Sequence, residues 1–307
     1  MRTVHPEAGP LVSLAEISEI ELVILKRMRA FTMGEHRSSV HGTGFDFVGL
    51  REWEAGDRFS SIDWAQSSLT NFTPLIVRDF DQPSTAGVIV VADGSLSTRC
   101  GLDGLPIAAT IARAIATIGM SAVFFQDSFG LVTYDEGFAH LEAVRPRIGK
   151  GQVLHCLDAY QYRRGGLEVK QTGTISQTLS GFLRRTTMLP VVSDFLLDDP
   201  EVVLAELAAL DTAHDVFLVI VDAAFAYEMP AVSAGWVEAF DVESGRVRLL
   251  SRGALTRMAG RVQDWQDEVE RRAHDHDLDV VRIGRDQARA DLALTEFALE
   301  RKLRKLK

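Results

Sequence analysis

Residues 86–97 read AGVIVVADGSLS, and this stretch decides the fold. Residues 86–92 are apolar and mostly β-branched or small, and the run closes at Asp93–Gly94, a pair typical of turns. A short continuous apolar run without polar alternation is typical of a strand that is buried on both faces. Parallel strands covered by helices have that environment, so the stretch predicts a parallel sheet inside an α/β domain.

Two later runs have the same character. Residues 188–193, MLPVVS, end at Asp194, and residues 215–221, DVFLVIV, end at Asp222. Segments with helical spacing of apolar residues alternate with these runs. The predicted helices span 15–31, 105–125, 151–162, 176–185, 200–210, 255–274 and 287–306, and a further strand spans 278–283. This alternation predicts a doubly wound, mostly parallel sheet with right-handed crossovers.

The chain divides most naturally near Gln82–Pro83. Residues 1–82 hold the first helix and then an irregular, charged and aromatic stretch, which we expect to form short strands and loops packed on the rest. Residues 83–307 hold the α/β domain. Strand patterns at 236–240 and 247–250 predict a hairpin inserted into that domain, within 236–250.

Composition excludes several classes of protein. The chain has 307 residues, 46% of them hydrophobic, and a formal net charge of −10. This charge disfavours unspecific nucleic-acid binding, which depends on clustered cations. Cys100 and Cys156 are too few for a disulfide scaffold. We find no stretch apolar and long enough to span a bilayer and no signal-peptide core in residues 1–21. We therefore expect a cytoplasmic protein without membrane insertion, whose basic end at 301–307 is a solvated helix terminus.

The loop after the first buried strand carries the clearest chemistry. In an open α/β sheet, ligands bind past the carboxyl ends of the strands. Asp93, Ser95 and Ser97 alternate there, so one carboxylate and two hydroxyls can converge. Hard oxygen ligands of this kind suit Mg²⁺, with Mn²⁺ or Ca²⁺ as alternatives. The competing interpretation is that Asp93 and Ser95 only stabilise the turn and cap the next helix.

The Asp-x-Ser-x-Ser pattern resembles the metal-ion-dependent adhesion site of von Willebrand factor A domains. That resemblance implies two further ligands, a Thr from a later loop and an Asp at the end of the next parallel strand. Thr174, which precedes a helix, and Asp194 match these roles, although Thr172 competes with Thr174 for the first. The implied metal set is Asp93, Ser95, Ser97, Thr174 and Asp194.

The segment before the strand is similar to the signature of a bacterial family called domain of unknown function fifty-eight. The stretch 41–80 reads HGTGFDFVGLREWEAGDRFSSIDWAQSSLTNFTPLIVRDF. The matching residues are Gly42, Gly44, Phe47, Leu50, Arg51, Glu52, Gly56, Asp57, Ile62, Asp63, Trp64 and Arg78. The sequence departs from the pattern at Ser61, at Ser68–Leu69 and at Thr98, where the family usually has Arg, Ala-Arg and Met. We interpret the charges at Arg51, Glu52, Asp57, Arg58 and Asp63 as a packing network that fixes this segment.

The resemblance implies a function in protein interaction. A bound ion in such domains keeps one coordination position open for a carboxylate of the partner. The family occurs beside MoxR-type AAA+ ATPases, so the resemblance implies an adaptor or co-chaperone that acts with such an ATPase on a client protein, in maturation or metal insertion. We expect no enzymatic activity.

Two alternatives come from other classes. Asp93 could be the nucleophile of a phosphoryl-transfer hydrolase similar to the haloacid-dehalogenase-like enzymes, but these need a second Asp where Ser95 stands. A purely structural module with an empty site is the other.

Overall fold

The computed structural model confirms the α/β class. It describes residues 9–33, 46–54, 62, 64–81, 87–102, 104–135, 138, 140–170, 173–183, 185–230, 235–240 and 246–305. The chain divides into two compact units. One comprises Met1–Arg27 and Ala86–Lys307, and the other comprises Met28–Thr85.

The larger unit is built on a seven-stranded sheet in the order β13-β10-β9-β3-β6-β7-β8. The strands are β3 (Gly87–Asp93), β6 (Ser128–Tyr134), β7 (Leu141–Arg147), β8 (Leu167–Glu168), β9 (Thr187–Ser193), β10 (Asp215–Val221) and β13 (Asp279–Ile283). The five strands from β13 to β6 are parallel, whereas β7 and β8 continue the sheet antiparallel. The sheet is therefore open and mostly parallel, as the resemblance to von Willebrand factor A domains implies.

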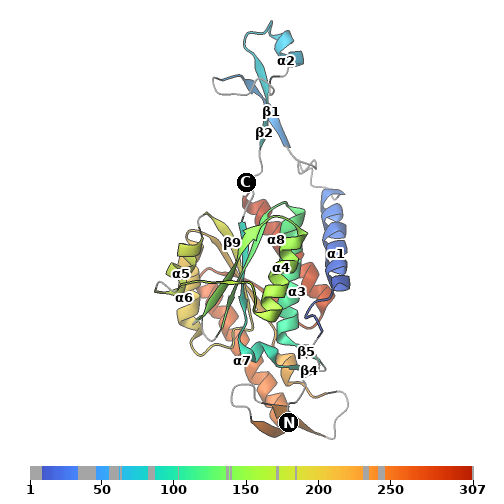
Figure 1. Cartoon of the computed structure of the whole chain (residues 1–307), viewed down its shortest axis with the longest axis vertical. Helices are drawn as coiled ribbons and strands as arrows, with labels where there is room; N and C mark the ends of the chain where they lie inside the picture. The colour runs from blue at the N-terminus through green and yellow to red at the C-terminus, as the bar shows by residue number, and fades with distance from the viewer. Residues whose placement is uncertain are drawn as a thin grey trace. The chain divides into compact units, whose positions relative to one another are not determined.

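Helices cover both faces of this sheet (Figure 1). On one face lie α3 (Ile107–Phe124), α4 (Lys150–Tyr162) and α8 (Gln287–Lys305). On the other lie α5 (Ile175–Phe182), α6 (Pro200–Asp211) and α7 (Arg252–Asp275). Burial on both faces explains why β3 and β10 are apolar without alternation: every residue of β10 is buried, as is β3 after its first residue.

Helix α3 is the central helix of the larger unit. Its residues from Ile107 to Ala122 are all buried. By length and composition alone this helix could cross a membrane, and 89% of it is buried inside the protein. This corrects the expectation that no stretch is long and apolar enough for that. A core helix passes the same test because burial against other helices selects the same side chains.

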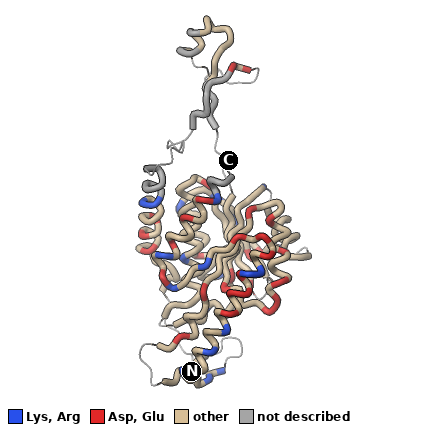
Figure 2. The backbone as a smooth tube through the Cα atoms, turned by 180° about the vertical axis from the view of Figure 1, so that it is seen from behind, with Lys and Arg blue, Asp and Glu red and all other residues tan. Residues whose placement is uncertain are grey.

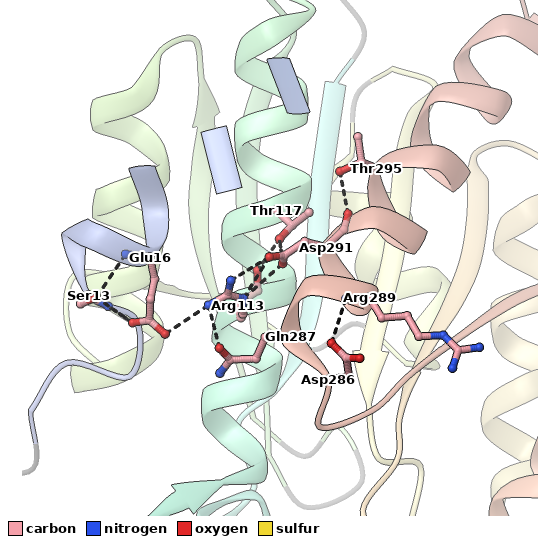
Figure 3. A network of polar contacts seen from close by, with 9 residues as sticks. All are labelled: Ser13, Glu16, Arg113, Thr117, Asp286, Gln287, Arg289, Asp291 and Thr295. Atoms are coloured by element: carbon pink, nitrogen blue, oxygen red, sulfur yellow. Dashed lines mark hydrogen bonds and ion pairs between the residues drawn. The ribbon is translucent and has the colours of Figure 1, made fainter. Parts of the chain in front are cut away.

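Helix α1 (Leu14–Met33) lies against this core through its first half (Figure 1). Ile17, Ile20 and Ile24 are buried at helical spacing. A buried ion pair reinforces the contact: Arg113 of α3 donates to Asp291 of α8, with 2.8 Å between Nη2 and Oδ2. The same guanidinium reaches Glu16 of α1 at 3.2 Å, so one side chain joins three helices (Figure 3).

The smaller unit holds the antiparallel pair β1 (Asp46–Glu52) and β2 (Ile76–Asp81), with the short helix α2 (Trp64–Leu69) between them. The expected short strands are present, but α2 was not expected. Ile62 pairs with Val77 in an isolated bridge, and both side chains are buried. Most charged residues of the predicted packing network, Asp57, Arg58 and Asp63, lie outside the described residues.

The predicted insertion is a two-stranded sheet of its own, β11 (Trp236–Phe240) paired with β12 (Val247–Ser251). It lies in the chain between the short 3₁₀ helix η4 (Ala224–Tyr227), which follows β10, and the start of α7. Another short 3₁₀ helix, η2 (Leu96–Arg99), and the small pair β4 (Gly101–Leu102) and β5 (Leu105–Pro106) follow β3. Since η4 contacts both α7 and β4, η4 and β4 lie together where β10 and β3 end.

Candidate metal centre

The carboxyl ends of the parallel strands β3, β9 and β10 are each followed by local turn chemistry on an Asp. Asp93, Asp194 and Asp222 each accept a hydrogen bond from the backbone N–H two residues further on, at 2.9, 3.1 and 2.9 Å. This is the Asx turn, in which a short carboxylate replaces a backbone acceptor. All three aspartates therefore stabilise a turn. Whether one of them also belongs to a binding site depends on its carboxylate oxygen that the turn does not use.

Asp93 is 2% exposed, and both of its oxygens are hydrogen bonded. Oδ1 accepts from the N–H of Ser95, while Oδ2 accepts from the hydroxyl of Ser193 at 2.7 Å. The Ser193 hydroxyl in turn accepts from the N–H of Phe195 at 2.9 Å. This chain of bonds ties the end of β3 to the end of β9 and fixes the orientation of the Asp93 carboxylate.

Asp194 differs from the other two strand-end acids. Its side chain is also 2% exposed, yet Oδ2 is buried and accepts no hydrogen bond from any described residue. Burial, and then the nearby Asp93 carboxylate, raise the pKa of Asp194 to about 7. A buried carboxylate oxygen without a donor is costly, and a cation beside it would remove that cost. Asp93 and Asp194 therefore form a pair of carboxylates with unused capacity for a positive ligand.

The two hydroxyls of the loop converge as the spacing predicts. Ser95 Oγ and Ser97 Oγ lie 2.9 Å apart, and both side chains are half-buried. Thr98 Oγ1 donates to the carbonyl of Ser95 at 2.7 Å, which closes the turn of η2. Gly94 donates its N–H to the carbonyl of Tyr134 at 2.7 Å, and a Cβ there would lie 3.1 Å from that oxygen. The loop is thereby held close against β6.

Side chains from distant helices support the two acids. Tyr160 of α4 donates its hydroxyl to the carbonyl of Asp93 at 2.8 Å. Gln266 of α7, fully buried, donates to the carbonyls of Asp194 and Val221, each at 2.8 Å. These supporting residues were not predicted. No local pattern marks them, because their role depends on how α4 and α7 pack.

Thr174 is placed differently from the other four predicted ligands. It caps the N-terminus of α5, where its Oγ1 accepts from the N–H of Gln177 at 3.3 Å and lies 2.9 Å from Ser176 Oγ. The Ser176 hydroxyl donates to Glu206 of α6 at 2.5 Å. Thr174 is exposed, and no described contact joins it to Asp93 or Asp194. The alternative, Thr172, lies outside the described residues.

The chemistry of the donor set fits a hard divalent cation. Asp93, Asp194, Ser95 and Ser97 offer two carboxylates and two hydroxyls at one end of the sheet, all oxygen ligands. Carboxylate oxygens that already accept one hydrogen bond keep a lone pair for a metal. Within the described ranges, no group of three or more His, Cys, Asp or Glu could hold a metal, so a soft or imidazole-rich site is not formed there.

Comparison with known proteins gives one family match. The family described as "Protein of unknown function DUF58" matches residues 49–271. This range includes the second half of β1, all of β2, the strands from β3 to β10 and most of α7. None of the curated proteins matches this chain.

Several solved structures are similar over much of the chain. BatB, a conserved hypothetical protein from Bacteroides thetaiotaomicron, is 12% identical, with a TM-score of 0.42 over 71% of this chain and 99% of that one. An aerotolerance-related membrane protein from Bacteroides fragilis is 11% identical, with a TM-score of 0.44 over 70% and 99%. The pilus adhesin SpaC from Lactobacillus rhamnosus is 12% identical, with a TM-score of 0.40 over 73% and 32%. At such scores, no property of these proteins is transferred to this chain.

Proposed function

The chain belongs to the DUF58 family, and from that premise we propose that it is a metal-ion-dependent protein-interaction module without catalysis of its own. The observation that carries the proposal is the buried Oδ2 of Asp194, which lacks a hydrogen-bond donor among the described residues and belongs to a carboxylate close to Asp93. An arrangement that serves folding alone has no reason to place two buried carboxylates together.

Asp93, Asp194, Ser95 and Ser97 would hold the ion, and Thr174 or Thr172 would complete the set after a rearrangement of the loop before α5. Mg²⁺ is the first choice, with Mn²⁺ and Ca²⁺ as alternatives. Once bound, the ion supplies a coordination position for a carboxylate of the partner. The protein's own part is to orient the ligands, which the bonds from Ser193, Tyr160 and Gln266 support.

The test is calorimetric titration of the full chain with Mg²⁺. Asp93→Ala should abolish measurable binding because it removes a charged ligand, whereas Ser95→Ala and Ser97→Ala should weaken it less because they remove neutral ones. Asp222→Ala is the matched control: it removes a strand-end acid that makes the same turn bond but is only half-buried. Thr174→Ala decides whether that hydroxyl joins the set.

Binding should also raise the melting temperature. A ligand that binds only the native state stabilises it by about 2.7 kcal/mol at a hundredfold excess over Kd. The metal reading would be refuted by an unchanged melting temperature in millimolar Mg²⁺, Mn²⁺ and Ca²⁺, together with an Asp93→Ala variant that titrates like wild type.

For the partner, we propose a MoxR-type AAA+ ATPase and a client protein that offers a carboxylate, so that this chain acts as an adaptor or co-chaperone. The support is the resemblance of the segment 41–80 and the family match. A pull-down of such an ATPase with wild type and Asp93→Ala, with and without EDTA, tests it. If wild type and Asp93→Ala both retained the ATPase in EDTA, partner binding would not depend on the ion.

The alternative of a phosphoryl-transfer hydrolase rests on Asp93 at the end of the first strand. Against it, both Asp93 oxygens accept hydrogen bonds, and Ser95 stands where a second acid would be needed. Turnover of a generic aryl phosphate that is lost in Asp93→Asn would favour the hydrolase.

A further inference from the structure

One stretch of this acidic chain has the opposite charge. Residues 246–263 contain no Asp or Glu, while the whole chain has a formal net charge of −10. The arginines of the stretch are Arg246, Arg248, Arg252, Arg257 and Arg261. They lie on β12 and its approach and on the first half of α7, where blue positions gather in Figure 2. All five are exposed.

Two of these arginines form a line on α7 that leads to the candidate metal centre. Arg257, Arg261 and Trp265 are four residues apart, so they share one face of the helix over about 12 Å. Trp265 Nε1 donates to the carbonyl of Phe195 at 3.0 Å, directly after Asp194. In the part of the chain that the structure describes, no ion pair engages Arg257 or Arg261. Later in the same helix, by contrast, Arg271 and Arg272 are paired with Glu268.

The hairpin that directly precedes α7 in the chain presents an apolar face. In the register of β11 and β12, Trp236, Glu238 and Leu249 lie on the same face as Val247, because directly paired residues and their neighbours two positions away share a face. Trp236, Val247 and Leu249 are 59%, 56% and 65% exposed. Apolar side chains exposed together, and arginines without ion pairs, are both typical of interaction surfaces, which are enriched in Trp and Arg.

We propose that this arginine face, defined as the exposed side of β11–β12 together with Arg257 and Arg261, is a docking surface for an acidic segment of a partner protein that also carries apolar side chains. The inference rests on the proposed function in one respect: the line of arginines leads to the site at which a partner carboxylate would bind the ion. Charge complementarity identifies the occupant, since Arg257 and Arg261 are exposed cations that no described ion pair engages, so they attract carboxylates and repel basic segments.

A protein segment fits better than a membrane surface. Glu238 lies within the apolar face, opposite Leu249, where an anionic bilayer would repel it. A peptide can place a polar or basic residue there and its carboxylates beside the arginines. The acidic charge of the remaining chain likewise disfavours approach to an anionic lipid surface.

The experiment measures binding of the full chain to a fluorescein-labelled synthetic peptide of glutamate and leucine, with a glutamine and leucine peptide as the uncharged probe. The double variant Arg257→Gln/Arg261→Gln should weaken the affinity for the glutamate peptide about five- to tenfold, and Leu249→Ser should weaken it severalfold. Raising the salt concentration should weaken wild type more than the double variant. The matched control is Arg27→Gln/Arg271→Gln, which makes the same change in net charge at exposed arginines elsewhere and should bind like wild type.

Equal affinity of wild type and the Arg257→Gln/Arg261→Gln variant would overturn the inference. So would arginine-dependent binding to phosphatidylglycerol vesicles without binding to the glutamate peptide, because the face would then contact lipid. Mg²⁺, EDTA and Asp93→Ala separate the two proposals. Arginine-dependent binding that survives EDTA and Asp93→Ala supports the docking surface even if the metal-dependent function fails. Binding that depends on Mg²⁺, is abolished by Asp93→Ala and is unchanged in the arginine variant would support the metal-dependent function and contradict the docking surface.

Discussion

At the scale of single residues, burial is energetically costly for the carboxyl group of Asp194. Its carboxyl group is buried beside Asp93, and its Oδ2 has no donor among the described residues. Folding therefore moves a group that is well solvated in the unfolded chain into a place where its ionised form is poorly stabilised. Protonation of the carboxyl group, or a cation bound beside it, would remove this cost.

The pH dependence of stability follows from this shift. The pKa of Asp194 rises from an ordinary 3.8 to about 7 on folding, so between these values the folded protein holds a proton that the unfolded chain has lost. Stability of the metal-free protein should therefore be greatest at the acidic end of this window and fall as pH rises through about 7. Asp194→Asn should remove that fall, and it should leave the variant more stable than wild type at about pH 8.

Urea unfolding in EDTA between about pH 5 and pH 8 measures the effect. Asp222→Asn is the control, since it changes a strand-end acid with the same Asx turn. Parallel pH profiles for wild type and Asp194→Asn would show that Asp194 does not titrate in this window.

At the scale of helices and strands, three helices depend on one buried ion pair. Arg113 is 6% exposed and Asp291 is 1% exposed, and Thr117 Oγ1 also donates to Asp291 at 2.8 Å. Asp291→Ala would leave the Arg113 guanidinium buried without its main partner. We expect a loss of about 3–5 kcal/mol in the free energy of unfolding.

The double variant Arg113→Met/Asp291→Leu should recover most of that loss, because apolar residues of similar volume can replace a buried pair. Glu21→Gln, which breaks the exposed pair with Lys150, should cost no more than about 1 kcal/mol. Denaturant unfolding of the three variants tests this order. A single variant Asp291→Ala as stable as Glu21→Gln would show that the network adds little to the packing of α1 and α8 on α3.

Regular elements of the larger unit are predictable from sequence because their apolar periodicity is strong. Strand β10 begins and ends as predicted, and β3, β9 and α6 differ by one residue from the predicted bounds. Helix α2 and the two-residue strand β8 were missed, since such short elements leave no periodicity to detect. Of the site, local spacing predicts the approach of Ser95 to Ser97.

The rest of the site depends on register and helix packing, which one sequence does not reveal. Ser193 reaches Asp93 only because β9 pairs with β3 in this register. Gln266 reaches the carbonyl of Asp194 only because α7 crosses the ends of β9 and β10. The N-terminus of α5, by contrast, is stabilised by Thr174 through a capping bond, a use of threonine that competes with metal binding.

At the scale of the whole molecule, the last prediction concerns the two units. The smaller one, Met28–Thr85, contains a two-stranded pair and a short helix. A two-stranded antiparallel pair is marginally stable at best in isolation. Residues 28–85 alone should therefore show no cooperative thermal transition.

The larger unit carries the sheet, its helices and the buried isoleucines of α1, so replacing 28–85 by a flexible glycine-serine linker should keep its cooperative unfolding and its response to Mg²⁺. Deleting 1–85 entirely should instead lower the melting temperature, because Arg113 loses Glu16 and the surface under Ile17, Ile20 and Ile24 becomes exposed. Circular dichroism melts of the three chains beside wild type decide between these outcomes. A sharp transition in 28–85 alone would show that this unit folds independently and would assign it a role separate from the α/β unit.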